Sequence, residues 1–148
     1  MTLLLPMLRH NLISAPHLQL TRLWLWIGLS MIFAIVALSV MNPPVAVKQF
    51  LLHDKLLHAL AYAGLMGWFA QIFHHRTTRV LLVIVFVAMG IGVEYLQAFN
   101  PRRLFDVSDM IANGTGVLIA WALAHTSLGH LLAWFEKHVL RVGSAQPR

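Results

Sequence analysis

Apolar residues fill four stretches of the chain, and clusters of polar or charged residues separate them. Leu23 to Met41 contains no charged residue and ends at an Asn-Pro-Pro sequence that stops a helix. Further apolar stretches cover residues 56–73, 80–99 and 110–124. A helix that spans a membrane needs about 20 predominantly apolar residues. The pattern therefore predicts an all-α polytopic membrane protein, a bundle of four transmembrane helices.

The C-terminal segment has a different pattern. Between residues 127 and 140, apolar side chains recur at helical spacing, and polar ones, His130, Glu136 and Lys137 with Arg141 just beyond, occupy the opposite face. This pattern predicts a short C-terminal interfacial helix that lies on the membrane surface. In the alternative, the segment continues the fourth span and carries His125 and Ser127 deep into the lipid, where polar groups are costly.

Composition supports the membrane assignment. Of the 148 residues, 59% are hydrophobic and 11% are charged, which excludes an ordinary soluble domain. The chain has no cysteine, so disulfides and thiolate metal sites are excluded. The formal net charge of +6 fits short basic loops beside membrane helices, so we expect no nucleic-acid partner.

The distribution of Lys and Arg predicts the orientation. Seven of the eleven basic residues fall on the side of the two termini. The positive-inside rule then places both termini in the cytoplasm of a bacterial inner membrane. The predicted connections are a cytoplasmic N-terminal segment 1–22, an outer loop 42–55, a cytoplasmic loop 74–79, an outer loop 100–109 and a cytoplasmic tail 125–148.

Four of the five acidic residues fall at the outer ends of spans two, three and four. Each of these helices carries one polar stripe at a spacing of three or four residues. The stripes comprise Asp54, His58 and Tyr62 with Lys55 beside them, then Gly90, Glu94 and Gln97, and then Asp106, Asp109, Asn113 and Gly116. Three helices therefore present polar groups at the same face of the membrane.

The depths of these polar groups also agree. At a rise of about 1.5 Å per residue, Glu94 lies about 7 Å inside Phe99. By the same rise His58 lies about 5 Å inside Lys55, and Asn113 about 6 Å inside Asp109. A carboxylate within a span is costly and needs a partner. We expect Glu94 to face His58, Tyr62 or Asn113.

The three polar blocks resemble the VanZ-like membrane proteins. The resemblance covers residues 50–124 and rests on Asp54-Lys55-x-x-His58-x-x-x-Tyr62, Glu94-x-x-Gln97 and Arg103-x-Phe105-Asp106-x-x-Asp109-x-x-x-Asn113-x-x-Gly116. Ala120 departs from the pattern, because similar proteins often have a second glycine there. The resemblance implies a small bacterial inner-membrane protein, in a family named after an accessory factor in glycopeptide resistance. It implies no particular reaction.

The first functional hypothesis is a pocket that binds a polar or anionic lipid-linked ligand at the outer face. Lys55, Arg102 and Arg103 would bind phosphate, while carboxylates orient these cations and accept hydrogen bonds from the ligand. The candidate ligand-binding residues are Asp54, Lys55, His58, Tyr62, Glu94, Gln97, Arg102, Arg103, Asp106, Asp109 and Asn113. The expected partners are membrane lipids, among them a lipid-linked envelope precursor.

Three alternatives remain open. In the first, the protein is an intramembrane enzyme with Glu94 and His58 as acid and base, although the chain contains no recognised catalytic motif. In the second, the polar groups only hold the helices together. In the third, which we rank last, they form an ion pathway. We expect no cofactor and no bound metal.

Overall fold

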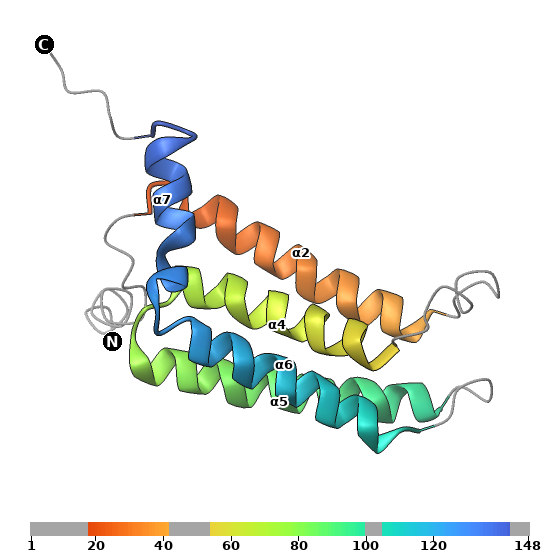
Figure 1. The fold of residues 1–148 in the computed structure, drawn as a ribbon. Coiled ribbons are helices and arrows are strands. Elements are labelled where there is room, and N and C mark those ends of the chain that lie inside the picture. Colours follow the sequence, from red (N-terminus) through yellow and green to blue (C-terminus); the bar gives the residue numbers. More distant parts are fainter. Residues whose placement is uncertain (1–17, 42–53, 100–104, 143–148) are drawn as a thin grey trace, which may run out of the picture.

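The computed structural model describes residues 18–41, 54–99 and 105–142. These residues form α2 (Thr21–Val40), α4 (Asp54–Ile72), α5 (Arg76–Ala98), α6 (Val107–Leu123), the 3-10 helix η1 (Ser127–His130) and α7 (Leu131–His138). The described residues contain no strand, which confirms the all-α prediction. Figure 1 shows α2, α4, α5 and α6 side by side, with successive helices running in opposite directions.

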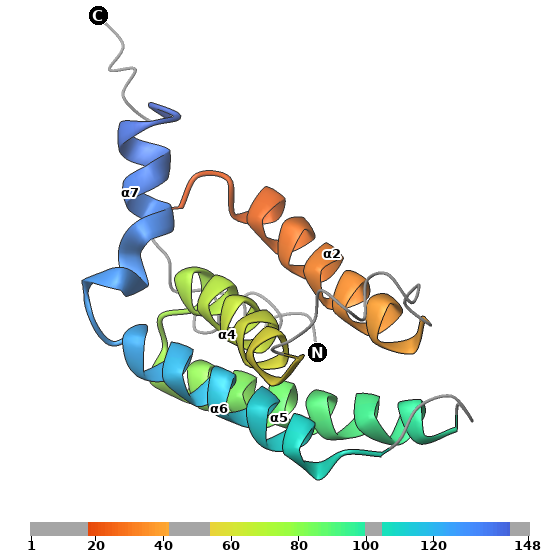
Figure 2. The same cartoon turned by 45° about the vertical axis from the view of Figure 1, so that its right-hand side comes forward.

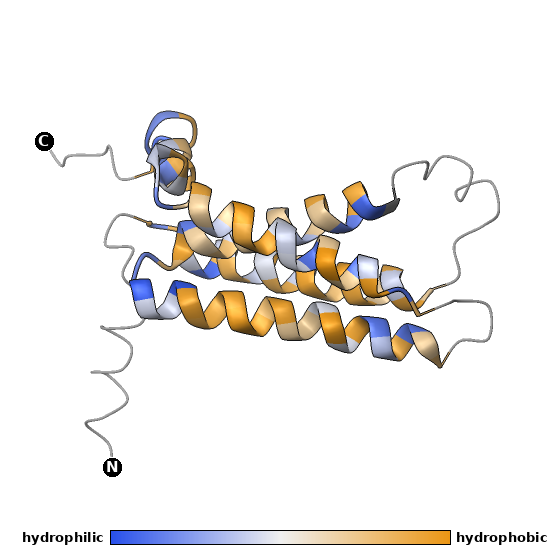
Figure 3. Cartoon of the chain, turned by 60° about the horizontal axis from the view of Figure 1, so that its bottom comes forward, coloured by the Kyte–Doolittle hydropathy of each residue, from blue (hydrophilic) through white to orange (hydrophobic). Residues whose placement is uncertain are grey.

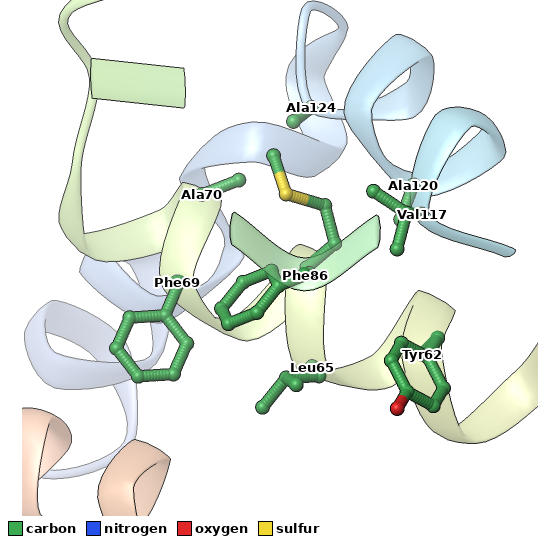
Figure 4. Packing of buried hydrophobic residues seen from close by; sticks show 9 residues of the cluster. Tyr62, Leu65, Phe69, Ala70, Phe86, Val117, Ala120 and Ala124 are labelled. Atoms are coloured by element: carbon green, nitrogen blue, oxygen red, sulfur yellow. The ribbon is translucent and has the colours of Figure 1, made fainter. Parts of the chain in front are cut away.

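Helix α4 is the centre of the fold, because it contacts α2, α5 and α6 and also η1 and α7. The main core consists of Tyr62, Leu65, Met66, Phe69, Ala70, Phe86, Val117, Ala120 and Ala124 (Figure 4). The outward faces are also apolar: Phe33, Ile84 and Ile111 are 75%, 60% and 64% exposed. Figure 3 shows apolar residues along the middle of the helices and polar residues toward both ends of the bundle. Such a surface suits lipid better than water.

The number of spans is not settled by helix length and apolarity. Among the described residues, α2 and α5 are long and apolar enough to cross a membrane, and the bent pair of α6 with η1 and α7 counts as a third span if taken as one. Helix α4 contains Lys55, His58 and Gln71, and α6 has only 17 residues. The four-span count therefore remains a prediction.

Helix α7 turns away from the bundle. The segment after α6 is bent by 82° relative to it, so α7 does not extend α6 in a straight line. Figures 1 and 2 show α7 across the end of the bundle, beside the start of α2. Leu132 packs there in a second apolar cluster with Leu18, Trp24 and Ile72.

Glu136 was expected on the polar face of α7, and this prediction is wrong. Its side chain is buried and accepts hydrogen bonds from the backbone N–H groups of Gln19 and Leu20, at 2.6 and 2.9 Å, and from the indole N–H of Trp24 at 2.5 Å. The first N–H groups of a helix lack partners within it. Glu136 therefore supplies acceptors where the chain enters α2.

Arg79 does not lie in a solvated loop, as the predicted loop 74–79 implied. Helix α5 begins at Arg76, and the buried Arg79 guanidinium donates to the carbonyls of Ala70, Phe73 and Ala124 at 2.8 to 2.9 Å. These carbonyls lie at the C-terminal ends of α4 and α6, where helix carbonyls lack partners and the dipole favours a cation. One buried cation thus supplies hydrogen-bond donors to the carbonyls at the ends of two helices.

Candidate functional site

The start of α6 organises the site. Asp106 precedes the helix, and its carboxylate accepts a hydrogen bond from the backbone N–H of Ser108 at 2.8 Å and another from the Ser108 hydroxyl. This is the side-chain cap that aspartate commonly provides. The backbone N–H of Asp106 itself donates to Glu94 Oε1 at 2.7 Å. The end of α5 and the start of α6 are joined by this contact.

Lys55 joins α4 to the start of α6. Its ammonium lies 2.8 Å from Asp106 Oδ2 and 3.1 Å from Asp109 Oδ1, and it also donates to the Ser108 hydroxyl oxygen. An ammonium has three N–H donors, and these three contacts use all of them. The Lys55 and Asp106 side chains are 54% and 47% exposed, so this ion pair forms the open rim of the site.

His58 lies one helical turn deeper than Lys55. Its Nδ1 is 3.2 Å from Asn113 Oδ1, and its Nε2 is 3.6 Å from Asp109 Oδ2. The His58 and Asp109 side chains are 16% and 13% exposed, and Asn113 is 2% exposed. The polar groups therefore form a continuous series from the exposed rim to the buried floor.

Two glycines allow the helices to approach closely at this site. A Cβ added to Gly116 would lie 2.0 Å from the carbonyl oxygen of Ala59, so α6 rests directly on the backbone of α4. A Cβ at Gly90 would lie 3.1 Å from the Asn113 Cβ. Small residues permit such contacts between membrane helices. The close approach brings the polar side chains within hydrogen-bond distance.

Tyr62 and Glu94 lie at the floor of the site, and each is 2% exposed. The Tyr62 hydroxyl is buried and has no hydrogen-bond partner among the described residues. A Cβ added to Gly90 would lie 3.3 Å from Asn113 Nδ2 and 3.4 Å from Tyr62 Cε1, so the Tyr62 ring lies beside the Asn113 side chain. A buried hydroxyl without a protein partner is costly, and a bound water, ion or other polar group commonly satisfies it.

The structure brings most of the predicted site residues together, with different partners. Lys55, His58, Tyr62, Glu94, Asp106, Asp109 and Asn113 lie at one end of the bundle. Glu94, expected to bind a side chain of α4 or α6, binds the Asp106 backbone. Gln97 instead donates to the carbonyl of Ser39 in α2 at 2.8 Å. Arg102, Arg103 and the side chain of Asp54 lie outside the described residues.

Sequence reasoning missed Ser108 as a site residue. Its hydroxyl donates to Asp106 and accepts from Lys55. The pattern Asp-x-Ser at a helix start, which favours a capping turn, was the available indication. The Lys55 ammonium donates a hydrogen bond to this hydroxyl and has no lone pair to accept its proton, so the arrangement does not activate Ser108 as a nucleophile.

The described residues contain no group of three or more His, Asp or Glu side chains arranged to hold a metal ion. In the site itself, the Lys55 ammonium occupies the space between Asp106 and Asp109 that a cation would take.

Asp106 gives the site a pH dependence. The hydrogen bond from Lys55, followed by those from Ser108, holds the pKa of the Asp106 carboxyl well below its usual range. A folded-state pKa below the unfolded value of about 3.9 means that the carboxylate stabilises the fold fully above that pH. The contribution is lost as the pH falls toward the folded-state pKa.

We therefore expect Asp106→Asn, which keeps an oxygen for the cap, to melt slightly below the wild type at pH 7. The difference should be small because the carboxylate is half exposed, and it should shrink at pH 2. Melting followed by circular dichroism at both pH values measures it. An equal difference at pH 7 and pH 2 would contradict the assignment.

Comparison with known proteins gives the family. A protein of Schizosaccharomyces pombe, itself described as uncharacterized, is 29% identical over 75 residues, which cover 49% of this chain and 46% of the yeast protein. The chain thus spans about half the length of this curated relative. No solved structure matches the chain with significance. The VanZ/LLP1 family profile matches residues 9–132, most of the chain, and confirms the resemblance seen in the three polar blocks. The chain therefore belongs to the VanZ/LLP1 family.

Proposed function

We propose that this protein binds the polar head group of a lipid-linked envelope precursor at the end of the bundle where α4, α5 and α6 present their polar residues. The observation that carries the proposal is the graded series from the exposed Lys55 and Asp106 to the buried Asn113 and Glu94. Purely structural polar groups between helices do not need an open rim. The Tyr62 hydroxyl at the floor, which has no partner among the described residues, also supports the binding of a polar group here.

The charges of the site favour a ligand rich in hydrogen-bond donors. The described part contains three carboxylates, Glu94, Asp106 and Asp109, and one ammonium, Lys55. A carboxylate has about four lone-pair sites, more than the contacts of these three use, so each can still accept hydrogen bonds from hydroxyl or amide groups such as those of a sugar. The phosphate of the ligand would then bind Arg102 and Arg103, whose guanidinium groups suit bidentate contacts.

The proposed membrane arrangement rests on the distribution of Lys and Arg along the chain and on the burial of polar residues between helices. Four spans, α2, α4, α5 and α6, cross a bacterial inner membrane, with the polar site in the outer leaflet and both termini in the cytoplasm. Burial of the polar residues of α4 and α6 against neighbouring helices supports the spans that apolarity alone does not show. Helix α7 lies at the cytoplasmic interface in this arrangement.

Native mass spectrometry of the full chain with its co-purifying lipids tests the binding proposal. We expect the wild type to retain a discrete phosphate-containing lipid. Asp109→Asn and Arg103→Ala should lower its occupancy about tenfold, the loss of a charge-assisted contact, with helicity unchanged. Thr115→Val, an exposed position on α6, is the matched control and should retain the lipid.

Two results would count against the proposal. If Asp109→Asn and Arg103→Ala retain the lipid as well as Thr115→Val does, the site does not bind it. If both variants mainly lower the melting temperature and the folded yield, the polar groups serve to hold α4, α5 and α6 together.

A second candidate is an enzyme that acts on the same lipid. One observation favours it: the His58 imidazole lies between the Asn113 amide and the Asp109 carboxylate, an arrangement that can hold a proton donor or acceptor in place. Glu94, the acid first paired with His58, is bound to Asp106. In an enzyme, His58→Gln would co-purify with unconverted lipid while the wild type would carry product, and identical lipid masses would exclude this candidate.

A further inference from the structure

A cavity of about 440 Å³ lies at the opposite end of the bundle from the polar site. It is bounded by the C-terminal ends of α4 and α6 and by the start of α5, at the left in Figure 1. Its lining residues are His74, Arg76, Arg79, Trp121, Ala122 and His125. All the ionisable residues among them are basic.

The positive charge of this cavity is not compensated by acids. Among the described residues, no carboxylate lies within 4 Å of the Arg76 or Arg79 guanidinium. The contacts of Arg79 are three backbone carbonyls at helix C-termini and the Nδ1 of His74 at 3.2 Å, so helix ends, and not a carboxylate, hold this guanidinium in place. The carboxylates of the polar site lie at the other end of the bundle, and Glu136 binds N–H groups of α2.

Two further features add hydrogen-bond donors and positive potential at the same place. Helix α5, of 23 residues, begins at Arg76, and its N-cap His75 makes no side-chain cap. The positive end of the helix dipole and free backbone N–H groups therefore face this region. Trp121, which lines the cavity, has a buried indole N–H with no acceptor among the described residues.

We propose that this cavity binds a phosphate group, either free or in the head group of an anionic lipid. The exposed Arg76 offers a guanidinium fork at the mouth, and the buried Arg79 supplies a fixed positive charge behind it. Basic pockets between membrane helices are known binding sites for lipid phosphates. The volume is sufficient for a phosphate with part of its head group.

This second site does not rest on the function proposed for the polar site. It uses other residues, at the other end of the bundle. The described residues of the polar site include three carboxylates and one ammonium, whereas all the ionisable residues that line this cavity are basic.

Isothermal titration calorimetry on the full chain in a neutral detergent tests the proposal with two probes at constant ionic strength. The probes are inorganic phosphate and the short-chain lipid dihexanoyl phosphatidic acid. We expect saturable binding to the wild type and a loss of about tenfold in affinity for Arg76→Gln, which removes a bidentate charge-assisted contact. Arg22→Gln removes the same charge from an exposed position in the first turn of α2, outside the cavity lining, and should stay within about twofold, as a screened surface charge does.

The outcomes distinguish a site for phosphate in general from a site for a lipid head group, and both from the absence of a defined site. Binding of both probes assigns a general phosphate site, and binding of the lipid probe alone assigns a head-group site. Absence of binding to the wild type overturns the proposal. Equal losses in Arg76→Gln and Arg22→Gln also overturn it, because they would indicate attraction to the basic surface and no defined site. Circular dichroism of both variants verifies that each remains folded.

Discussion

Replacing Gly116 with alanine is expected to destabilise the protein by about 3 kcal/mol or more, at the upper end of the cost of overpacking a core. The added Cβ would lie 2.0, 2.8 and 3.0 Å from the O, C and Cα atoms of Ala59, which belong to backbone and cannot rotate away. Helices α4 and α6 must therefore move apart. The contacts of Lys55 and His58 with α6 would lengthen together, so ligand binding should be lost with stability.

Gly114→Ala is the matched control, because it makes the same substitution on the same helix. No atom lies within 4 Å of a Cβ added at Gly114. Alanine favours a helix over glycine by up to about 1 kcal/mol, so this variant should melt at or above the wild-type temperature. Thermal melting in detergent, followed by circular dichroism, compares the two. Similar melting of both variants would contradict the close approach of α4 and α6.

Glu136→Ala is expected to have the second large effect, about 3 kcal/mol or more. The substitution leaves three N–H donors, those of Gln19, Leu20 and Trp24, without their acceptor. The Trp24 indole is buried, where an unsatisfied donor costs about 1 to 3 kcal/mol, and the two backbone donors, nearer the surface, add less. It also removes the carboxylate from the positive end of α2. Helix α7 should separate from the bundle, and hydrogen exchange should accelerate in α7 and at the start of α2.

Two further variants make this prediction specific. Glu136→Gln keeps one acceptor oxygen and should fall between the wild type and Glu136→Ala. Lys137→Gln alters the adjacent exposed residue and should exchange and melt like the wild type, as most surface substitutions do. If Glu136→Ala exchanges no faster than Lys137→Gln, Glu136 does not hold α7 in place.

The two ends of the bundle use buried charge in different ways. At the polar site, carboxylates and an ammonium from different helices contact one another and leave the rim open. At the opposite end, Arg79 and Glu136 bind backbone groups at helix ends, which completes hydrogen bonds that the helices cannot make themselves. Substitutions of the charged residues at the polar site should mainly change ligand binding, and those of Arg79 and Glu136 should mainly change stability.

The sequence by itself determined the all-helical class and the end of the helices at which the candidate site residues lie. Apolar stretches set the helices, and the spacing of Lys55 with His58, and of Asp109 with Asn113, placed each pair on one helical face. The three blocks also identified the family, because they occur in order on successive helices. These properties depend on local periodicity, which needs no knowledge of how the helices pack.

Only the tertiary structure decided which groups contact one another. Glu94 binds the Asp106 backbone because the end of α5 meets the start of α6, and Gln97 faces α2 because of the rotation of α5. Arg79 and Glu136 look like surface charges in the sequence, yet both are buried. Their partners are mainly backbone groups at the ends of other helices. Every residue has such groups, so the sequence does not show which of them a side chain will bind. The rotation of the helices and their close approach, as at Gly116 and Ala59, determine which groups contact one another.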